Sequence, residues 1–177
     1  MKNFLGLKKL TVRELCTLGL LTALTVVLAI YCTFRIGNAI KIPLKFITVF
    51  LTSVSFGPIW GGIVAAIGDI LNSVLVPVGA PLPQITVIEF IYGFIFGLFF
   101  YNKQKNYFIR TLLCSLLLSI IDITVVSFIL TTVGYFPSFA VAVSVRFTAT
   151  IIKFAVYILV LLFFKKHLNN FERQINK

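Results

Sequence analysis

The sequence predicts an all-α integral membrane protein with six transmembrane helices. Of its 177 residues, 59% are hydrophobic and only 12% are charged, whereas a soluble domain is about 45–50% apolar and about 25% charged. The mean hydropathy is +1.05. Most apolar stretches are too long for soluble strands and lack the alternation of a β-barrel, so helices are the expected spanning elements.

Six apolar stretches give the expected spans of one membrane domain covering residues 1–177, namely 11–34, 42–56, 58–75, 84–101, 107–131 and 138–164. Thr11 followed by Glu14 has the capping-box spacing that starts a helix. Pro43 and Pro58 suit a first helical turn, where a missing N–H is tolerated. The stretch 42–56 is short for a crossing of about 20 residues, so we expect it to be tilted or partly interfacial.

The distribution of basic residues predicts that both termini are cytoplasmic in a multi-pass protein of the cell membrane. Six spans put both termini on one side, and that side carries eleven Lys and Arg residues against three on the other, which is the positive-inside pattern. The first apolar run lacks a small-residue cleavage site and is expected to stay as a span. The three outer residues share one connector: Arg35, Lys41 and Lys45. They suggest either an anionic solute arriving from outside or contact with lipid headgroups.

Residues 56–101 hold two apolar segments joined by a Pro/Gly-rich connector, and each segment contains one acid. These acids are Asp69, which follows a run of small residues, and Glu89. Small residues let helices approach closely in lipid. A carboxylate inside a span is costly and by default marks a functional site.

Charged residues on four different spans are expected at similar depth in the outer half of the membrane. A rise of about 1.5 Å per residue places Asp69, Glu89, Asp122 and Arg146 roughly 8–14 Å from the outer ends of their spans. They can pair with each other or line a cavity, and Asp69 is expected to pair with Arg146 or with a ligand. Lys153 shares a helix face with Arg146 and can either neutralise Asp122 or form the floor of a pocket.

No enzyme is indicated, and the sequence predicts no catalytic residues, cofactor or metal site. It contains no phosphate-binding loop, nucleophile–base pair or clustered metal ligands, and its three cysteines lie in separate apolar segments. The basic residues lie mostly between or beyond the spans, which argues against nucleic acid. The chain is small for a secondary transporter built from two inverted halves. It fits a small binding protein in the bilayer that belongs to a larger assembly.

Four motifs resemble those of the substrate-binding S components of energy-coupling factor (ECF) vitamin transporters. They are Lys41-x-Pro-Leu-x-Phe-Ile47, Phe56-Gly-Pro-x-x-Gly-Gly-x-x-x-Ala-x-Gly-Asp69, Pro77-x-Gly79 and Tyr92-Gly-x-x-x-Gly97. The resemblance covers nearly the whole chain and is greatest to the folate-specific S component. It implies six helices, a bacterial cell membrane and high-affinity vitamin uptake from outside. It also implies docking on a transmembrane coupling protein that carries two ATPase subunits.

The resemblance also implies roles for particular residues. Gly19 and Ala23 match the small-residue docking pattern of the first helix, with Gly in place of the first Ala. Folate carboxylates need Arg or Lys, and the pterin edge needs a carboxylate such as Asp69. Phe46, Tyr92 and Phe147 are candidates for stacking on the pterin. The expected substrate site comprises Arg35, Lys41, Phe46, Asp69, Glu89, Tyr92, Asp122 and Arg146.

Two other functions remain open at this point. One is an S component for another vitamin, such as pantothenate. The other is a structural membrane protein whose buried charges pair only with each other. Binding of a vitamin separates the second possibility from transport.

Overall fold

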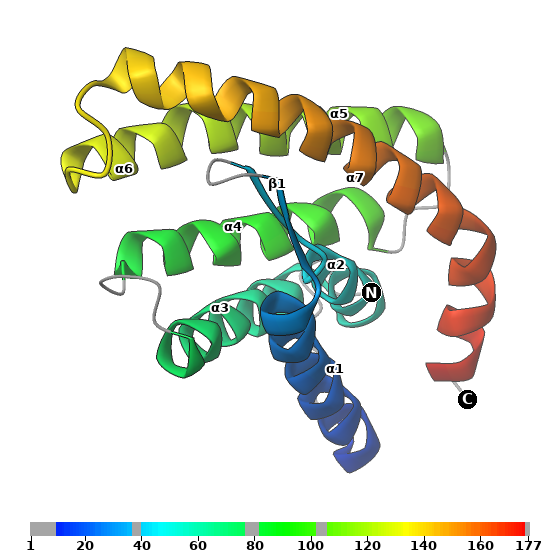
Figure 1. Cartoon of the computed structure of the whole chain (residues 1–177). Helices are drawn as coiled ribbons and strands as arrows, with labels where there is room; N and C mark the ends of the chain where they lie inside the picture. Colours follow the sequence, from blue (N-terminus) through cyan, green and yellow to red (C-terminus); the bar gives the residue numbers. More distant parts are fainter. Residues whose placement is uncertain (1–9, 37–39, 77–81, 102–105, 176–177) are drawn as a thin grey trace.

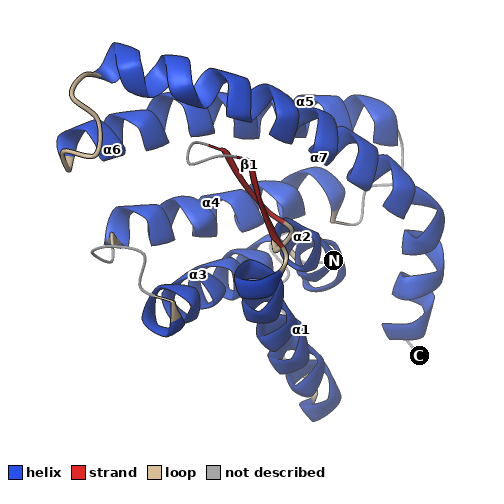
Figure 2. Cartoon of the chain, viewed as in Figure 1, coloured by secondary structure: helices blue, strands red, loops and turns tan. Residues whose placement is uncertain are grey.

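The structure is a computed structural model that describes residues 10–36, 40–76, 82–101 and 106–175, with the side chains of 34–36, 40–42 and 164–175 outside the description. Helices dominate the described chain, and one short β-hairpin interrupts them (Figures 1 and 2). The elements are α1 (Val12–Tyr31), β1 (Thr33–Ile36), β2 (Ile40–Pro43), α2 (Phe46–Phe56), α3 (Pro58–Leu75), α4 (Pro83–Phe100), α5 (Tyr107–Ile121), the π-helical turn η1 (Asp122–Val126), α6 (Ser127–Thr132) and α7 (Phe139–Ile175).

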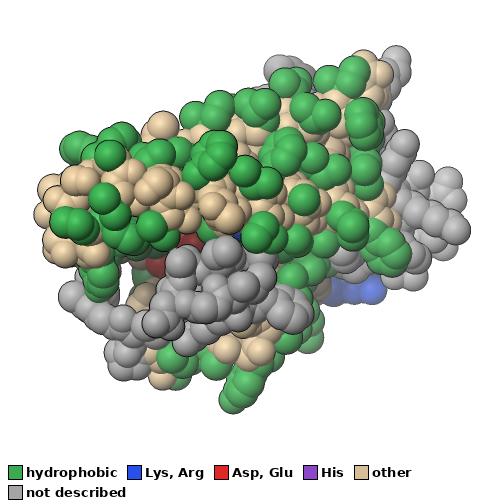
Figure 3. All heavy atoms as spheres, turned by 45° about the horizontal axis from the view of Figure 1, so that its top comes forward, with side chains coloured by type: hydrophobic (Ala, Val, Ile, Leu, Met, Phe, Trp, Pro, Cys, Tyr) green, Lys and Arg blue, Asp and Glu red, His purple; other side chains and the backbone are tan. Residues whose placement is uncertain are grey.

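Five helical segments are long and apolar enough to cross a membrane: α1, α3, α4, the continuous α5–η1–α6 and the first 25 residues of α7. The sixth, α2, has 11 residues. At about 1.5 Å per residue it is too short to cross a hydrocarbon core of about 30 Å. The face in Figure 3 agrees with a lipid environment, since hydrophobic side chains lie over much of its described part and acidic ones are visible only in a small gap.

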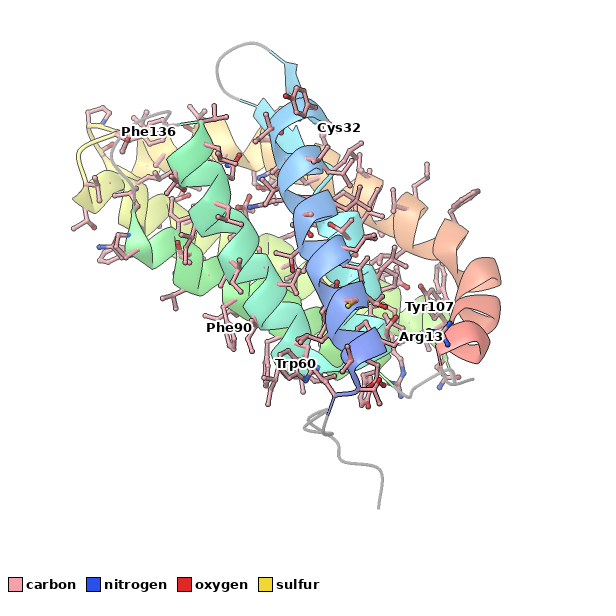
Figure 4. The ribbon with its side chains drawn as sticks, turned by 90° about the horizontal axis from the view of Figure 1, so that it is seen from below. Arg13, Cys32, Trp60, Phe90, Tyr107 and Phe136 are labelled. Carbon is pink, nitrogen blue, oxygen red and sulfur yellow. The ribbon has the colours of Figure 1, made fainter. Side chains whose placement is uncertain are left out.

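The helices form two groups with the hairpin between them (Figure 1). We call α1 to α4 the N-terminal half and α5 to α7 the C-terminal half. Arg13, Trp60 and Tyr107 mark one end of the molecule, and Cys32 and Phe136 mark the other (Figure 4). The hairpin follows α1 at the Cys32 end, which we call the hairpin end.

Glycines bring the helices of the N-terminal half into close contact. A Cβ atom at Gly93 of α4 would overlap the backbone of Gly61 on α3, and one at Gly97 would overlap Pro58. The hydroxyl of Ser53 on α2 donates to the carbonyl of Gly93 at 2.8 Å. Backbones this close are typical of small-residue packing in membranes, and they explain the small residues seen in the sequence between 57 and 97.

Aromatic side chains fill the core where the two halves meet near the far end from the hairpin. The Phe50 ring of α2 contacts Phe96 and Phe100 edge-on, at centroid distances of 5.8 and 5.2 Å. Phe100 in turn packs on Tyr107 at the start of α5, 5.1 Å away. Edge-to-face contacts of this kind add to the burial of the rings, so this cluster holds α5 against α2 and α4.

The hairpin corrects the expectation of an entirely helical chain. The first predicted span, 11–34, is helical only to Tyr31, and the second, 42–56, is helical only from Phe46. The intervening segment is rich in β-branched residues, which favour strands. It pairs antiparallel with Arg35 opposite Lys41, and the Leu44 N–H donates to the Cys32 carbonyl at 3.1 Å to close its base. The hydrophobicity of this segment therefore reflects strands and not helix ends.

One further helix end and the interior of one helix differ from the sequence prediction, and one feature agrees. The last helix was expected to end at Phe164, but α7 continues to Ile175, through most of the polar tail. The stretch 107–131 was expected to be a plain helix, but it contains the π-turn η1. The capping box at Thr11 is present, with the Thr11 N–H donating to Glu14 Oε2 at 2.7 Å.

Candidate functional site

A cavity of about 80 Å³ lies between the two halves, where α2, α4, α5 and α7 meet at the end of β2. Ion pairs and aromatic rings both contribute to its wall. Its lining residues are Pro43, Lys45, Phe46, Val49, Glu89, Tyr92, Phe96, Leu118, Ser119, Asp122, Thr150, Lys153 and Tyr157. The cavity is smaller than the roughly 300–1,000 Å³ of typical small-molecule pockets, so a ligand of vitamin size requires its walls to move apart.

The N-terminal half contributes a buried ion triad, which we call the lysine cluster. Lys45 lies between β2 and α2, and its Nζ is 3.2 Å from Asp69 Oδ1 and 2.9 Å from Glu89 Oε1. Thr86 donates to the second oxygen of Asp69 at 3.0 Å. The two carboxylates and the ammonium group lie within ion-pair distance, which offsets the cost of burying their charges.

The C-terminal half contributes a second network around Asp122, which we call the aspartate cluster. Asp122 Oδ1 accepts from Arg146 at 2.6 Å and from the Tyr92 hydroxyl at 3.4 Å. Oδ2 accepts from Lys153 at 3.0 Å and from Thr150 at 3.2 Å. Asp122 is the first residue of η1, and its backbone carbonyl also accepts from Arg146 Nε at 3.4 Å. Single π-turns occur often at functional sites.

The two clusters leave different groups available to a ligand. Both carboxylate oxygens of Asp122 already accept from two donors each within the protein, and Asp69 does not line the cavity. Glu89 does line it, and only its Oε1 has a partner among the described residues. Lys153 gives one bond to Asp122 and keeps further donors, because an ammonium has three. The cavity therefore offers a carboxylate acceptor on one wall and an ammonium donor on another.

Aromatic rings supply the apolar part of the cavity wall. The ring centroids of Phe46 and Tyr157 are 4.6 Å apart, and the two rings meet edge-on. The centroid of Tyr157 is 6.4 Å from that of Phe96. Tyr92 faces the same space. Phe147, a candidate for stacking, is 54% exposed and does not line the cavity. A planar ring entering this cavity would meet Phe46, Tyr92 and Tyr157.

The structure brings some of the predicted site residues together and separates others. Phe46, Glu89, Tyr92 and Asp122 line the cavity, while Asp69 and Arg146 lie behind it and hold Lys45 and Asp122. Of the two alternatives for Asp69, the pair with Arg146 is wrong, because Asp69 pairs with Lys45 and Arg146 pairs with Asp122. The side chains of Arg35 and Lys41 lie outside the described part of the chain.

Several lining residues escaped the sequence reasoning. Lys45 was grouped with the outer basic residues, but its side chain is 9% exposed and sits in the lysine cluster. Thr150 and Tyr157 were not assigned to the site, although their spacing puts them on the same helix face as Arg146 and Lys153, which was the available signal. Lys153 was expected either to neutralise Asp122 or to form the floor of a pocket. In the structure it does both, since it pairs with Asp122 and also lines the cavity.

The predicted docking residues lie away from the cavity on α1. Gly19 and Ala23 are exposed, and a Cβ added at Gly19 would meet nothing within 4 Å. The opposite face of α1 packs on α3 through Leu18, Leu21 and Val64. α1 therefore presents an open small-residue face outward.

These features define a class: a helical membrane protein with a buried, aromatic and ion-lined binding cavity. Comparison with known sequences is consistent with this class and makes it more specific. The family described as "ECF-type riboflavin transporter, S component" matches residues 9–170. The chain belongs to this family of S components, which are binding subunits of transporters and not enzymes.

Two curated relatives are folate transporters of bacteria, each named FolT. One, from Clostridium novyi, is 40% identical over 67 residues, which is 38% of this chain and 39% of the relative. The other, from Leuconostoc mesenteroides, is 28% identical over 99 residues, which is 55% of this chain and 52% of the relative. The matched regions thus span about half or less of each relative.

Two solved structures share the fold over nearly their whole length. A FolT structure bound with folic acid has a TM-score of 0.79 and 26% identity, covering 89% of this chain and 95% of that one. The S component of a bacterial ECF transporter has a TM-score of 0.62 and 27% identity, covering 90% and 96%. The S-component fold and a multi-pass bacterial membrane protein are therefore established.

Proposed function

We propose that this chain is the folate-binding S component of an ATP-driven ECF uptake transporter. The observation that carries the proposal is the cavity, in which Glu89 has one carboxylate oxygen without a partner among the described residues, beside the rings of Phe46, Tyr92 and Tyr157. A pterin ring presents adjacent N–H donors on one edge, which a carboxylate accepts through charge-assisted hydrogen bonds. The similarity to a FolT that binds folic acid supports the same ligand.

Glu89 replaces Asp69 as the proposed partner of the pterin edge. Asp69 is engaged with Lys45 and Thr86 and is absent from the cavity wall. Its proposed role is to position Lys45. Lys153 is the proposed donor to a ring acceptor, and Arg35 and Lys41 on the hairpin remain the proposed partners of the folate carboxylates.

Riboflavin is the second candidate because of the family description. A flavin ring presents one N–H between two carbonyls, so a carboxylate in the position of Glu89 would face only one donor. The pterin edge satisfies Glu89 more fully, which favours folate. Pantothenate, which lacks an aromatic ring, would leave the aromatic wall without a stacking partner.

We propose that the termini and the α4–α5 connection face the cytoplasm and that the hairpin end faces outward. Eleven basic residues on the terminal side support this orientation. Figure 4 places Arg13 and Tyr107 at the end opposite Cys32, in agreement with that grouping. A vitamin would then enter from the hairpin end. The coupling protein and two ATPases of an ECF module would supply the energy.

A titration of the purified chain with folic acid, riboflavin and pantothenate tests the substrate. We expect isothermal titration calorimetry to show the tightest binding for folic acid. Tighter binding of riboflavin would contradict the folate assignment and keep the S-component role. Binding of none of the three would favour a purely structural membrane protein.

Docking is tested with Gly19→Val and Ala23→Val, which add bulk to the open face of α1. We expect both variants to bind folic acid like the wild type, because neither residue approaches the cavity. Uptake by cells that supply the ECF module should fail, because close helix contact needs small residues. Ile70→Val, at an exposed position on α3, serves as the control and should leave uptake intact.

A further inference from the structure

We propose that Ser119 is a ligand-contacting residue that helps to select the ring bound in the cavity. Its hydroxyl would hydrogen-bond a heteroatom of a planar nitrogen heterocycle. The inference rests on the proposed function, since it requires such a ring in this cavity. It adds a contact from α5 to those offered by α4 and α7.

The first observation is that the Ser119 hydroxyl is buried and has no hydrogen-bond partner among the described residues. The threonine hydroxyls at 111 and 124 of the continuous α5–η1–α6 segment bond back to the preceding turn, whereas its buried serine hydroxyls, at 115, 119 and 127, have no partner among the described residues. Thr111 donates to the Tyr107 carbonyl at 3.0 Å, and Thr124 donates to the Ile120 carbonyl at 2.7 Å. A buried hydroxyl that does not use this local bond calls for another partner.

The second observation is the position of Ser119. It lines the same cavity as Glu89 and Lys153. It lies three residues before Asp122, so the two side chains share one face of the helix. Asp122 cannot be the missing partner, because both of its oxygens already accept from two donors each.

Ser115 provides a matched comparison one turn earlier on α5. Its hydroxyl is also buried and unpartnered among the described residues, but Ser115 does not line the cavity. A general property of buried serines on this helix would affect both residues alike. A role in ligand binding would affect Ser119 alone.

The test compares the full-length wild type, Ser119→Ala and Ser115→Ala in detergent. Calorimetric titration with folic acid should show binding weakened about 10-fold in Ser119→Ala, the equivalent of one hydrogen bond of about 1.4 kcal/mol. Ser115→Ala should stay within about 2-fold of the wild type. Without ligand, the melting temperature of Ser119→Ala should match or exceed that of the wild type, because the variant removes an unpaired buried hydroxyl.

Weakened binding without loss of stability is the signature that a merely structural serine would not give. If Ser119→Ala does not fold, Ser119→Cys keeps the side-chain size, offers only a weak donor and should weaken binding in the same direction. Equal affinity in the wild type and the folded Ser119 variant overturns the proposal, as does an equal loss in Ser115→Ala.

The wild-type titration separates failure of this inference from failure of the proposed function. If the wild type binds riboflavin and not folic acid, the folate assignment fails, and the same comparison with riboflavin decides the role of Ser119. If the wild type binds neither compound, both proposals are overturned. If it binds folic acid and the serine variants do not differ, only the role of Ser119 is rejected.

Discussion

The two halves of the molecule hold their helices together in different ways. In the N-terminal half, glycine backbones touch across α3 and α4, and hydroxyls link neighbouring helices, as in the 2.8 Å bond from Thr25 to Thr48. In the C-terminal half, the one described glycine is in the turn before α7, and the α5 segment contains a π-turn.

This difference predicts that one half of the cavity wall is fixed and the other can move. The close backbone contacts of the N-terminal half fix the lysine cluster, since a shift of one helix would create overlap with the next. The C-terminal half holds the aspartate cluster with longer side chains and an irregular helix. Widening of the cavity is therefore expected to come from movement of α5 and α7 against a fixed N-terminal half.

The largest predicted effect comes from breaking the lysine cluster. Lys45→Met would leave Asp69 and Glu89 buried without their cation, and we expect a loss of about 3–5 kcal/mol in the free energy of unfolding. Lys153→Met in the other half is the matched variant. It should cost less, because Asp122 keeps Arg146, Thr150 and Tyr92. Chemical unfolding in detergent measures both losses, and equal values would remove the distinction between the clusters.

The next effect is on ligand binding, and it distinguishes the roles of the two acids in the lysine cluster. Glu89→Gln should weaken folic acid binding by about 1.5–3 kcal/mol, the range of a hydrogen bond to a charged group. Asp69→Asn should weaken it less, because Asp69 acts through Lys45. Titration calorimetry of both variants gives the comparison. A larger loss for Asp69→Asn would return Asp69 to direct contact with the ligand.

A smaller effect is expected from overpacking the glycine contact. Gly93→Ala places a methyl group against the Gly61 backbone and should lower the free energy of unfolding by about 1–3 kcal/mol. Gly19→Ala has open space around it and is the control, expected within about 0.5 kcal/mol of the wild type. If Gly93→Ala leaves the free energy of unfolding unchanged, the helices of the N-terminal half can move apart, and this half is not as rigid as its contacts predict.

The smallest effect concerns the hairpin between the halves. A contact of Arg35 with the glutamate of folic acid near water is expected to contribute about 0.2–1 kcal/mol and to weaken as salt is added. Arg35→Ala should therefore reduce binding of folic acid and leave pteroic acid, which lacks the glutamate, nearly unchanged. Equal losses for the two ligands would assign Arg35 to the loop structure or to the ring.

The membrane class, the approximate positions of the helices and the family resemblance could be predicted from the sequence, because they depend on hydrophobic length and local motifs. It did not reveal the hairpin, since residues 33–43 were divided between the ends of two expected spans and a basic connector, and only their β-branched content indicates strands. It placed the charged residues at similar depth but could not give their direction around each helix. For that reason it left Asp69 to pair with Arg146 or with a ligand, whereas Asp69 pairs with Lys45 and Arg146 pairs with Asp122.

The two ion clusters also have a consequence for how deeply a ligand can enter. The lysine cluster has two carboxylates for one cation, and the aspartate cluster has two cations for one carboxylate. One wall is thus negative, the other is positive, and their sum is neutral. An uncharged ring with a dipole can lie across such a field, whereas a dianion would add two uncompensated charges in a region of low dielectric constant. The electrostatic balance of the cavity therefore favours a ligand with a neutral head inside and a charged tail that stays in water.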